Sequence, residues 1–189
     1  MKVIALEHCG GHTPQCAPRM TLLPDSALVL NGNPVFLPEF SDEWFVRIYV
    51  AFRICRLGKG IGAKFASRYR DGVTLAARII PADIRRDFAA ESGADGLLGA
   101  FDNALTLGAW QAIPSDGVLR VEVGSAQPVE FSPESCGIDS AIPMLSNYMT
   151  LKMGDVVMPV SVPLEIPVKV GDRLELKLNS VDVGAVRFK

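Results

Sequence analysis

This sequence has few cysteines, nearly balanced positive and negative charge, and no long hydrophobic run. Its 189 residues contain four scattered cysteines (Cys9, Cys16, Cys55 and Cys136), which do not make a disulfide framework. Nineteen Lys and Arg stand against 21 Asp and Glu, so the net charge of −2 offers no electrostatic basis for binding nucleic acid. We therefore expect neither a disulfide-rich domain nor a nucleic-acid-binding protein.

Apolar stretches are short throughout. Only the four apolar residues 3–6 separate Lys2 from Glu7, which is too few for the core of a signal peptide. No apolar run is long enough to span a bilayer, and no run of like charge indicates a membrane-surface patch. The expected compartment is therefore the cytoplasm, with no membrane partner.

The residues that are present favour a β-rich domain with many turns. Hydrophobic residues make up 49% and charged residues 21%, which excludes disorder as a description of the whole chain. Seventeen Gly and 13 Pro recur between strand-like runs. We expect a single domain over residues 1–189, mostly β (α+β) with a few short helices.

The clearest predicted strand covers residues 44–54. Every even position from Trp44 to Ile54 is apolar, so one face of the strand is buried. The odd positions include Arg47, Tyr49 and Arg53, and this second face is expected to line a cleft or to meet solvent.

Other segments carry weaker signals. Residues 27–37 are expected to form two strands around the Asn31-Gly32 turn, and residues 174–188 two strands around Asn179-Ser180. Residues 156–170 have β character, but three prolines place them at a sheet edge or corner. Short helices are expected within residues 59–69, after Pro81 and after Asp139.

Five motifs, taken together, carry a family resemblance. They are LPDSAL at 23–28, FRICRLGK at 52–59, AFD at 100–102, YMTLKMGD at 148–155 and VKVGDRLE at 168–175. In this order and spacing they resemble the short bacterial members of the fumarylacetoacetate hydrolase family. The resemblance runs from Pro24 to the end and leaves residues 1–23 as a divergent, shortened segment. It implies a compact β-roll or barrel that is usually a homodimer.

The resemblance also implies a metal-dependent active site. Family members hold Mg²⁺ or Mn²⁺ with an E-x-E pair on a strand and a later aspartate, and they hydrolyse acylpyruvates or decarboxylate or tautomerise 2-oxo diacids. In this sequence the three ligand positions hold Arg47, Tyr49 and Arg78. Exchanging three anions for two cations and a phenol changes the charge of the site by about five units. We therefore expect no metal site and no cofactor.

Other positions of the family site are partly kept. Asp83, Asp102 and Ser161 match the family's active-site region, and His12 matches its N-terminal histidine. His12 is the candidate general base, although Gln15 stands where the family has the carboxylate that would orient it. The candidate substrate-binding residues are Arg47, Tyr49, Arg78, Asp83, Asp102 and Ser161.

The two arginines are expected to lie close together, because the family positions that they occupy share one ion. Two interpretations follow. Arg47 and Arg78 can each pair with a nearby carboxylate such as Asp83 or Asp102, which would fill the pocket. Alternatively, they can bind the carboxylate or enolate of a ligand, since the guanidinium fork suits such anions.

The cysteines and histidines offer little further chemistry. His8, Cys9, His12 and Cys16 lie within nine residues but lack the spacing and the second cluster of a zinc site. Cys55 and Cys136 have no neighbouring histidine in the sequence, so a nucleophilic role is not expected for either.

Three functional hypotheses remain. The sequence favours a family member that has lost the metal site and the family's activity, with residual binding of a small carboxylate or 2-oxo acid. The second is an active hydrolase, decarboxylase or tautomerase with an arginine-lined site, in which His12 or Tyr49 moves a proton. The third is a metal bound at a shifted site that uses Asp83, Asp102 or Glu165.

Overall fold

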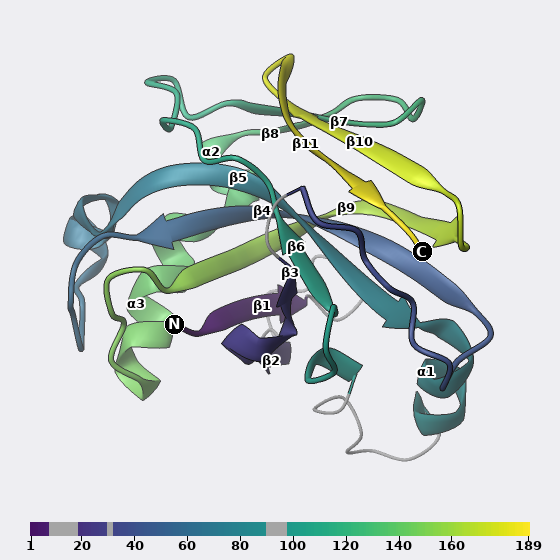
Figure 1. The fold of residues 1–189 in the computed structure, drawn as a ribbon. Helices are drawn as coiled ribbons and strands as arrows, with labels where there is room; N and C mark the ends of the chain where they lie inside the picture. Colours follow the sequence, from purple (N-terminus) through teal and green to yellow (C-terminus); the bar gives the residue numbers. More distant parts are fainter. Residues whose placement is uncertain (8–18, 30–31, 90–97) are drawn as a thin grey trace.

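A computed structural model describes residues 1–7, 19–29, 32–89 and 98–189 (Figure 1). Strands predominate and the helices are short, which confirms the predicted mostly-β, α+β class. In chain order, with η marking 3-10 helices, the elements are β1 (Val3–Glu7), β2 (Arg19–Leu23), η1 (Asp25–Ala27), β3 (Leu28–Val29), β4 (Trp44–Ile54), η2 (Ala63–Tyr69), β5 (Arg70–Pro81), α1 (Ala82–Ala89), β6 (Leu105–Leu107), β7 (Leu119–Val123), β8 (Val129–Phe131), α2 (Pro133–Cys136), α3 (Ile138–Tyr148), β9 (Val156–Val168), β10 (Arg173–Leu178) and β11 (Val181–Arg187). In this part of the chain, no helix is long and apolar enough to cross a membrane.

Two sheets make up the body of the molecule. The larger has the strand order β2-β1-β9-β4-β5-β6-β3, and the smaller has the order β11-β10-β7-β8 and lies over one face of it (Figure 1). The larger sheet curls, so that Leu23 of β2 and Leu28 of β3, from its two edges, pack around the same buried cluster. The result is a β-roll with an enclosed inner face.

The central strand β4 has both faces buried. Its even positions, such as Ile48, pack in the main core between the two sheets together with Leu176 of β10. Its odd positions Tyr49 and Ala51 are also buried, in the smaller cluster inside the roll. The prediction that the odd face lines a cleft or meets solvent is therefore wrong for Tyr49 and Ala51, because the curl of the sheet encloses them. It is also wrong for Phe45, which is buried.

Two predicted strand arrangements differ from the structure. β3 pairs in parallel with β6, and Val35 bridges Phe188 near the C-terminus, so residues 27–37 do not pair as a hairpin where they are described. β9 runs as one strand despite its prolines. It lies between β1 and β4 over Val156–Met158 and pairs with β4 alone beyond that point. The predicted edge position is thus right for the later part of β9 and wrong for its start.

The remaining predicted elements are present. α1 follows Pro81 directly, α3 covers most of the predicted third helix, and residues 63–69 form η2. β10 and β11 form the predicted C-terminal hairpin. Its turn residues Asn179 and Ser180 both have positive φ angles, of 52° and 63°, as a tight turn between antiparallel strands requires.

Candidate functional site

β4 and β5 bring Arg47 and Arg78 together inside the roll. The two residues are direct partners in the antiparallel pairing, so their side chains lie on the same face of the sheet. Tyr49, two residues further along β4, shares this face and is fully buried. The predicted proximity of the two arginines is confirmed, because both of them bond to the same carboxylate.

That carboxylate belongs to Glu7, at the end of β1. Its Oε1 atom accepts hydrogen bonds from Arg78 Nη1 at 2.7 Å, from Tyr49 Oη at 3.0 Å and from Arg47 Nη1 at 3.2 Å. We call Glu7, Arg47, Tyr49 and Arg78 the Glu7 cluster. Three donors converge on one oxygen, so the cluster is a built anion site whose present occupant is a protein side chain.

Glu7 is not among the residues predicted from the sequence, although its position on the strand carries a signal. Side chains on a strand alternate between faces, so Glu7 continues the row of Val3 and Ala5. Both of these belong to the buried cluster inside the roll. An acidic residue that extends an inward-facing apolar row therefore needs a buried cationic partner.

The charges of the Glu7 cluster favour the ion-paired state. Burial alone would raise the pKa of Glu7, but Arg78 and Arg47 outweigh it and hold that pKa below its usual value. Burial and the Glu7 charge raise the pKa of Tyr49, so its hydroxyl stays protonated and donates to the carboxylate. At neutral pH the cluster therefore holds two positive charges and one negative charge.

A second carboxylate, Glu165 of β9, bonds to Arg47 from the cavity side. Glu165 is the direct pairing partner of Arg47 across β4 and β9, and it accepts a hydrogen bond from Arg47 Nη2. Its Oε1 atom also accepts one from Arg85 Nη1 of α1 at 3.0 Å. Burial would raise the pKa of Glu165, but these two arginines lower it.

An open cavity of about 510 Å³ lies against this network. Its charged and hydroxyl-bearing lining residues are Glu7, Arg19, Arg47, Arg85, Ser161 and Glu165. Three guanidinium groups thus face two carboxylates in the described lining, and the buried Arg78 behind Glu7 adds a further positive charge. This excess of positive charge suits an anionic ligand.

Arg78 is the most buried charged residue of the cluster, with 3% of its surface exposed. Its Nε atom has no hydrogen-bond partner among the residues that the structure describes. A Cβ atom placed on Gly99 would lie 3.5 Å from Arg78 Nη2, so the guanidinium lies close to the backbone of Gly99.

Asp83 and Asp102 do not take part in this network. The Asp83 carboxylate accepts hydrogen bonds from Ser41 Oγ, from the Asp42 N–H before β4 and from the Ile84 N–H in α1, and the Ser41 bond lowers its pKa. Asp102 is exposed and does not line the cavity. The predicted pairing of the arginines with Asp83 or Asp102 is therefore wrong. β1 and β9, rather than α1, carry the carboxylates that face Arg47.

The remaining candidate residues are Ser161, the histidines and the cysteines. Ser161 lines the cavity, whereas His12, like His8, Cys9 and Cys16, lies outside the described residues. Cys136 is buried in α2, and burial raises its pKa to about 12. Cys55 places its Sγ atom 3.5 Å from the carbonyl oxygen of Arg68, away from the cavity.

The three residues that the family resemblance assigns to metal positions, Arg47, Tyr49 and Arg78, do not fit a divalent cation. Guanidinium groups only donate hydrogen bonds, and the hydroxyl of Tyr49 is protonated and engaged with Glu7. Within residues 1–7, 19–29, 32–89 and 98–189, no three or more His, Cys, Asp or Glu side chains are grouped so as to hold a metal ion. Among these residues, Asp83, Asp102 and Glu165 are thus not part of such a group.

Known proteins are similar to this chain in sequence and in fold. No family model matches the sequence. An uncharacterized protein of Pyrococcus horikoshii is 25% identical over 194 residues, which cover 95% of this chain and 84% of that protein.

Two solved structures share the fold over nearly the whole chain. One is a 5-carboxymethyl-2-hydroxymuconate delta-isomerase from Mycobacterium smegmatis (TM-score 0.82, 23% identity, 99% of this chain and 78% of that one). The other is a fumarylpyruvate hydrolase from Pseudomonas aeruginosa in complex with Mn²⁺ and pyruvate (TM-score 0.85, 16% identity, 100% of this chain and 89% of that one). The fold expected from the resemblance to the fumarylacetoacetate hydrolase family is confirmed.

Proposed function

We propose that this chain is a fumarylacetoacetate hydrolase-like protein that works without a divalent metal, has lost the family's metal-dependent activity, and binds a small carboxylate or 2-oxo acid. One observation carries the proposal. Two arginines and a tyrosine, at the positions that the family resemblance assigns to metal ligands, together hold the Glu7 carboxylate.

The loss of the metal follows from charge. A divalent cation at this place would lie among the guanidinium groups of Arg47 and Arg78, each of which repels it. The Glu7 carboxylate cannot compensate, because both arginines already bond to it. Metal-assisted stabilisation of an enolate, which the family resemblance implies, is therefore absent from the proposed function.

Anion binding follows from the same residues. The arrangement holds one carboxylate, that of Glu7, and the cavity beside it has further donors on Arg85 and Ser161. The fumarylpyruvate hydrolase with this fold contains pyruvate, a 2-oxo acid, together with Mn²⁺. In the present chain we propose that guanidinium groups supply the positive charge that a metal supplies in the family.

A metal-independent tautomerase or decarboxylase is the second candidate, because Tyr49 places a hydroxyl in the Glu7 cluster. However, that hydroxyl is fully buried, has a raised pKa and is committed to Glu7 at 3.0 Å. A group that keeps its proton and is shielded from solvent is poorly suited to exchange protons with a substrate. Binding without turnover is therefore the function that the geometry supports best.

Calorimetric titration of the metal-stripped protein tests the proposal. We expect no heat of binding with Mg²⁺ or Mn²⁺, and binding of oxalate without either ion. Arg85→Gln should weaken oxalate binding at least about tenfold, because a charge-assisted hydrogen bond contributes about 1.5–3 kcal/mol. Arg120→Gln, on the smaller sheet, is the matched control and should bind as the parent does. Oxalate binding that requires a metal would show the proposal to be wrong.

A further inference from the structure

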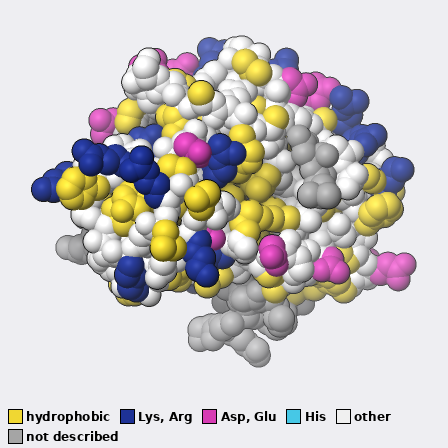
Figure 2. Space-filling model, turned by 60° about the vertical axis from the view of Figure 1, so that its left-hand side comes forward, with side chains coloured by type: hydrophobic (Ala, Val, Ile, Leu, Met, Phe, Trp, Pro, Cys, Tyr) yellow, Lys and Arg dark blue, Asp and Glu magenta, His cyan; other side chains and the backbone are white. Residues whose placement is uncertain are grey.

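One end of the molecule carries basic and exposed apolar side chains together, and none of them lines the cavity. The segments 55–69 and 147–154 contribute both kinds. The basic residues are Arg56, Lys59, Lys64, Arg68 and Lys152, and the apolar ones are Leu57, Phe65, Tyr148 and Met153. We call these nine residues the basic patch. Figure 2 brings this side forward and shows dark-blue and yellow side chains interleaved on it.

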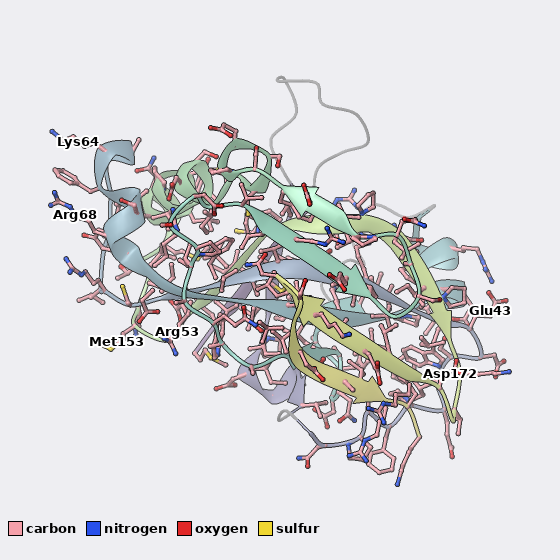
Figure 3. The ribbon with its side chains drawn as sticks, turned by 90° about the horizontal axis from the view of Figure 1, so that it is seen from above. Glu43, Arg53, Lys64, Arg68, Met153 and Asp172 are labelled. Carbon is pink, nitrogen blue, oxygen red and sulfur yellow. The ribbon has the colours of Figure 1, made fainter. Side chains whose placement is uncertain are left out.

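The charge of the basic patch contrasts with the rest of the chain. Neither segment contains an acidic residue, whereas the other 14 Lys and Arg are outnumbered by 21 Asp and Glu. Figure 3 shows Lys64, Arg68 and Met153 at one end of the molecule and the acidic Glu43 and Asp172 at the other. An overall charge near zero thus conceals a local excess of positive charge in these two segments.

The cations of the basic patch remain available to a partner. Over the part of the chain that the structure describes, none of the five forms an ion pair, whereas the neighbouring Arg53 and Arg70 pair with Asp71 and Asp139. Two of the cations flank an aromatic ring. Lys64 Nζ lies 4.9 Å and Arg68 Cζ 5.1 Å from the centre of the Phe65 ring.

Exposed apolar side chains stand between these charges. Leu57, Tyr148 and Met153 are 69%, 77% and 76% exposed, and Phe65 is 39% exposed. Single exposed apolar residues are ordinary, but four within one cationic surface are typical of an interaction site.

The backbone beneath the basic patch is well fixed. Gly58 and Leu151 exchange two hydrogen bonds of 2.9 Å, which join the two segments. Ser146 of α3 holds the chain before η2, since its carbonyl accepts from the Gly60 N–H at 2.9 Å and its Oγ from the Ile61 N–H at 2.8 Å. A surface with a fixed backbone loses little conformational freedom when it binds.

We infer that the basic patch is a docking surface for an acidic protein segment with interspersed apolar side chains. The carboxylates of such a segment pair with the five cations, and its apolar side chains rest on Leu57, Phe65 and Met153. The inference is independent of the proposed function of the cavity. A second copy of this chain is disfavoured as the partner, because a twofold contact through the patch would bring like charges together.

A fluorescence polarisation assay with a labelled synthetic peptide of repeated Glu-Glu-Leu units tests the inference. The triple variant Lys64→Gln, Arg68→Gln, Lys152→Gln should weaken binding at least about tenfold, and moderate salt should weaken binding to the parent protein. The triple variant Lys169→Gln, Lys177→Gln, Lys189→Gln removes the same charge elsewhere and should bind as the parent does. Phe65→Ser should weaken binding about threefold, because it removes exposed apolar area.

Several results would overturn the inference. One is equal weakening by both triple variants, which would indicate only a general charge effect. Another is binding to phosphatidylserine vesicles or to single-stranded DNA without binding to the peptide. A third is patch-dependent self-association in sedimentation velocity. Equal binding of a Gln-Gln-Leu peptide would show that carboxylates are not what the patch recognises. Thermal unfolding of each variant confirms that the fold is kept.

Discussion

The Glu7 carboxylate and the Arg78 guanidinium meet at 2.7 Å across the inside of the roll. Two strands, β9 and β4, lie between β1 and β5 in the sheet, so this ion pair joins parts of the sheet that are not neighbours. Only 4% of the Arg78 side chain and 22% of the Glu7 side chain are exposed. The pair therefore couples the N-terminal strand to the centre of the sheet through a contact that is buried on the Arg78 side and partly exposed on the Glu7 side.

Replacing Glu7 by glutamine should lower the stability of the protein. Glu7→Gln leaves two guanidinium groups without their shared counter-charge, and the loss of one partner of a buried pair costs about 3–5 kcal/mol. Because Glu7 is partly exposed, we expect a loss at the lower end of that range in urea denaturation. The control Glu130→Gln changes an exposed glutamate and should shift stability by less than about 0.5 kcal/mol. Equal stabilities of the two variants would contradict a structural role for the Glu7 cluster.

The same ion pair predicts a pH dependence. The pKa of Glu7 is below its usual value of 4.5, so the unfolded chain binds a proton at a higher pH than the folded protein does. The contribution of Glu7 to stability is therefore fully present above the unfolded-state pKa and is lost as the pH falls through the folded-state pKa. We expect the free energy of unfolding to fall more steeply below about pH 4.5 in the parent than in Glu7→Gln. Parallel curves for the two proteins would refute this assignment.

Local patterns were enough to predict much of the fold. The even apolar row of residues 44–54 and the Asn179-Ser180 turn depend on neighbours in the sequence, and the structure confirms both. The proximity of Arg47 and Arg78 followed from the family resemblance. Glu7 and Glu165 were not predicted as their partners, because that requires the order β1-β9-β4-β5. Strand order depends on long-range pairing, which a single sequence does not display.

Restoring the family's metal ligands should restore metal binding. The triple variant Arg47→Glu, Tyr49→Glu, Arg78→Asp would surround one point with carboxylates and would leave Glu7 without its cations. We expect the apo form to be less stable than the parent, and Mn²⁺ to raise its melting temperature. A metal present at about a hundred times its dissociation constant stabilises by about 2.7 kcal/mol. The parent protein is the control and should show no response to Mn²⁺.

The outcome of the triple variant depends on whether it folds. If it is folded by circular dichroism and Mn²⁺ has no effect, residues 47, 49 and 78 do not correspond to the family's ligand positions. If it is unfolded without metal, the additional substitution Glu7→Gln removes one repulsive carboxylate and should recover a folded, metal-responsive protein.

Gly58 offers a test of the backbone beneath the basic patch. A Cβ atom at this position would lie 2.5 Å from Tyr69 Cε1 and 2.8 Å from Ile61 Cδ1, which is closer than packed atoms tolerate. Gly58→Ala should therefore lower the free energy of unfolding by about 1–3 kcal/mol, the usual cost of overpacking. It should also weaken binding of the Glu-Glu-Leu peptide, because relief of the clash moves the segment that carries Arg56 and Leu57. Gly62→Ala is the matched control, since its nearest neighbour, Phe65 Cδ2, lies 3.8 Å away. If Gly58→Ala is destabilised but binds the peptide as tightly as the control does, the fixed backbone is a feature of the fold and contributes nothing to docking.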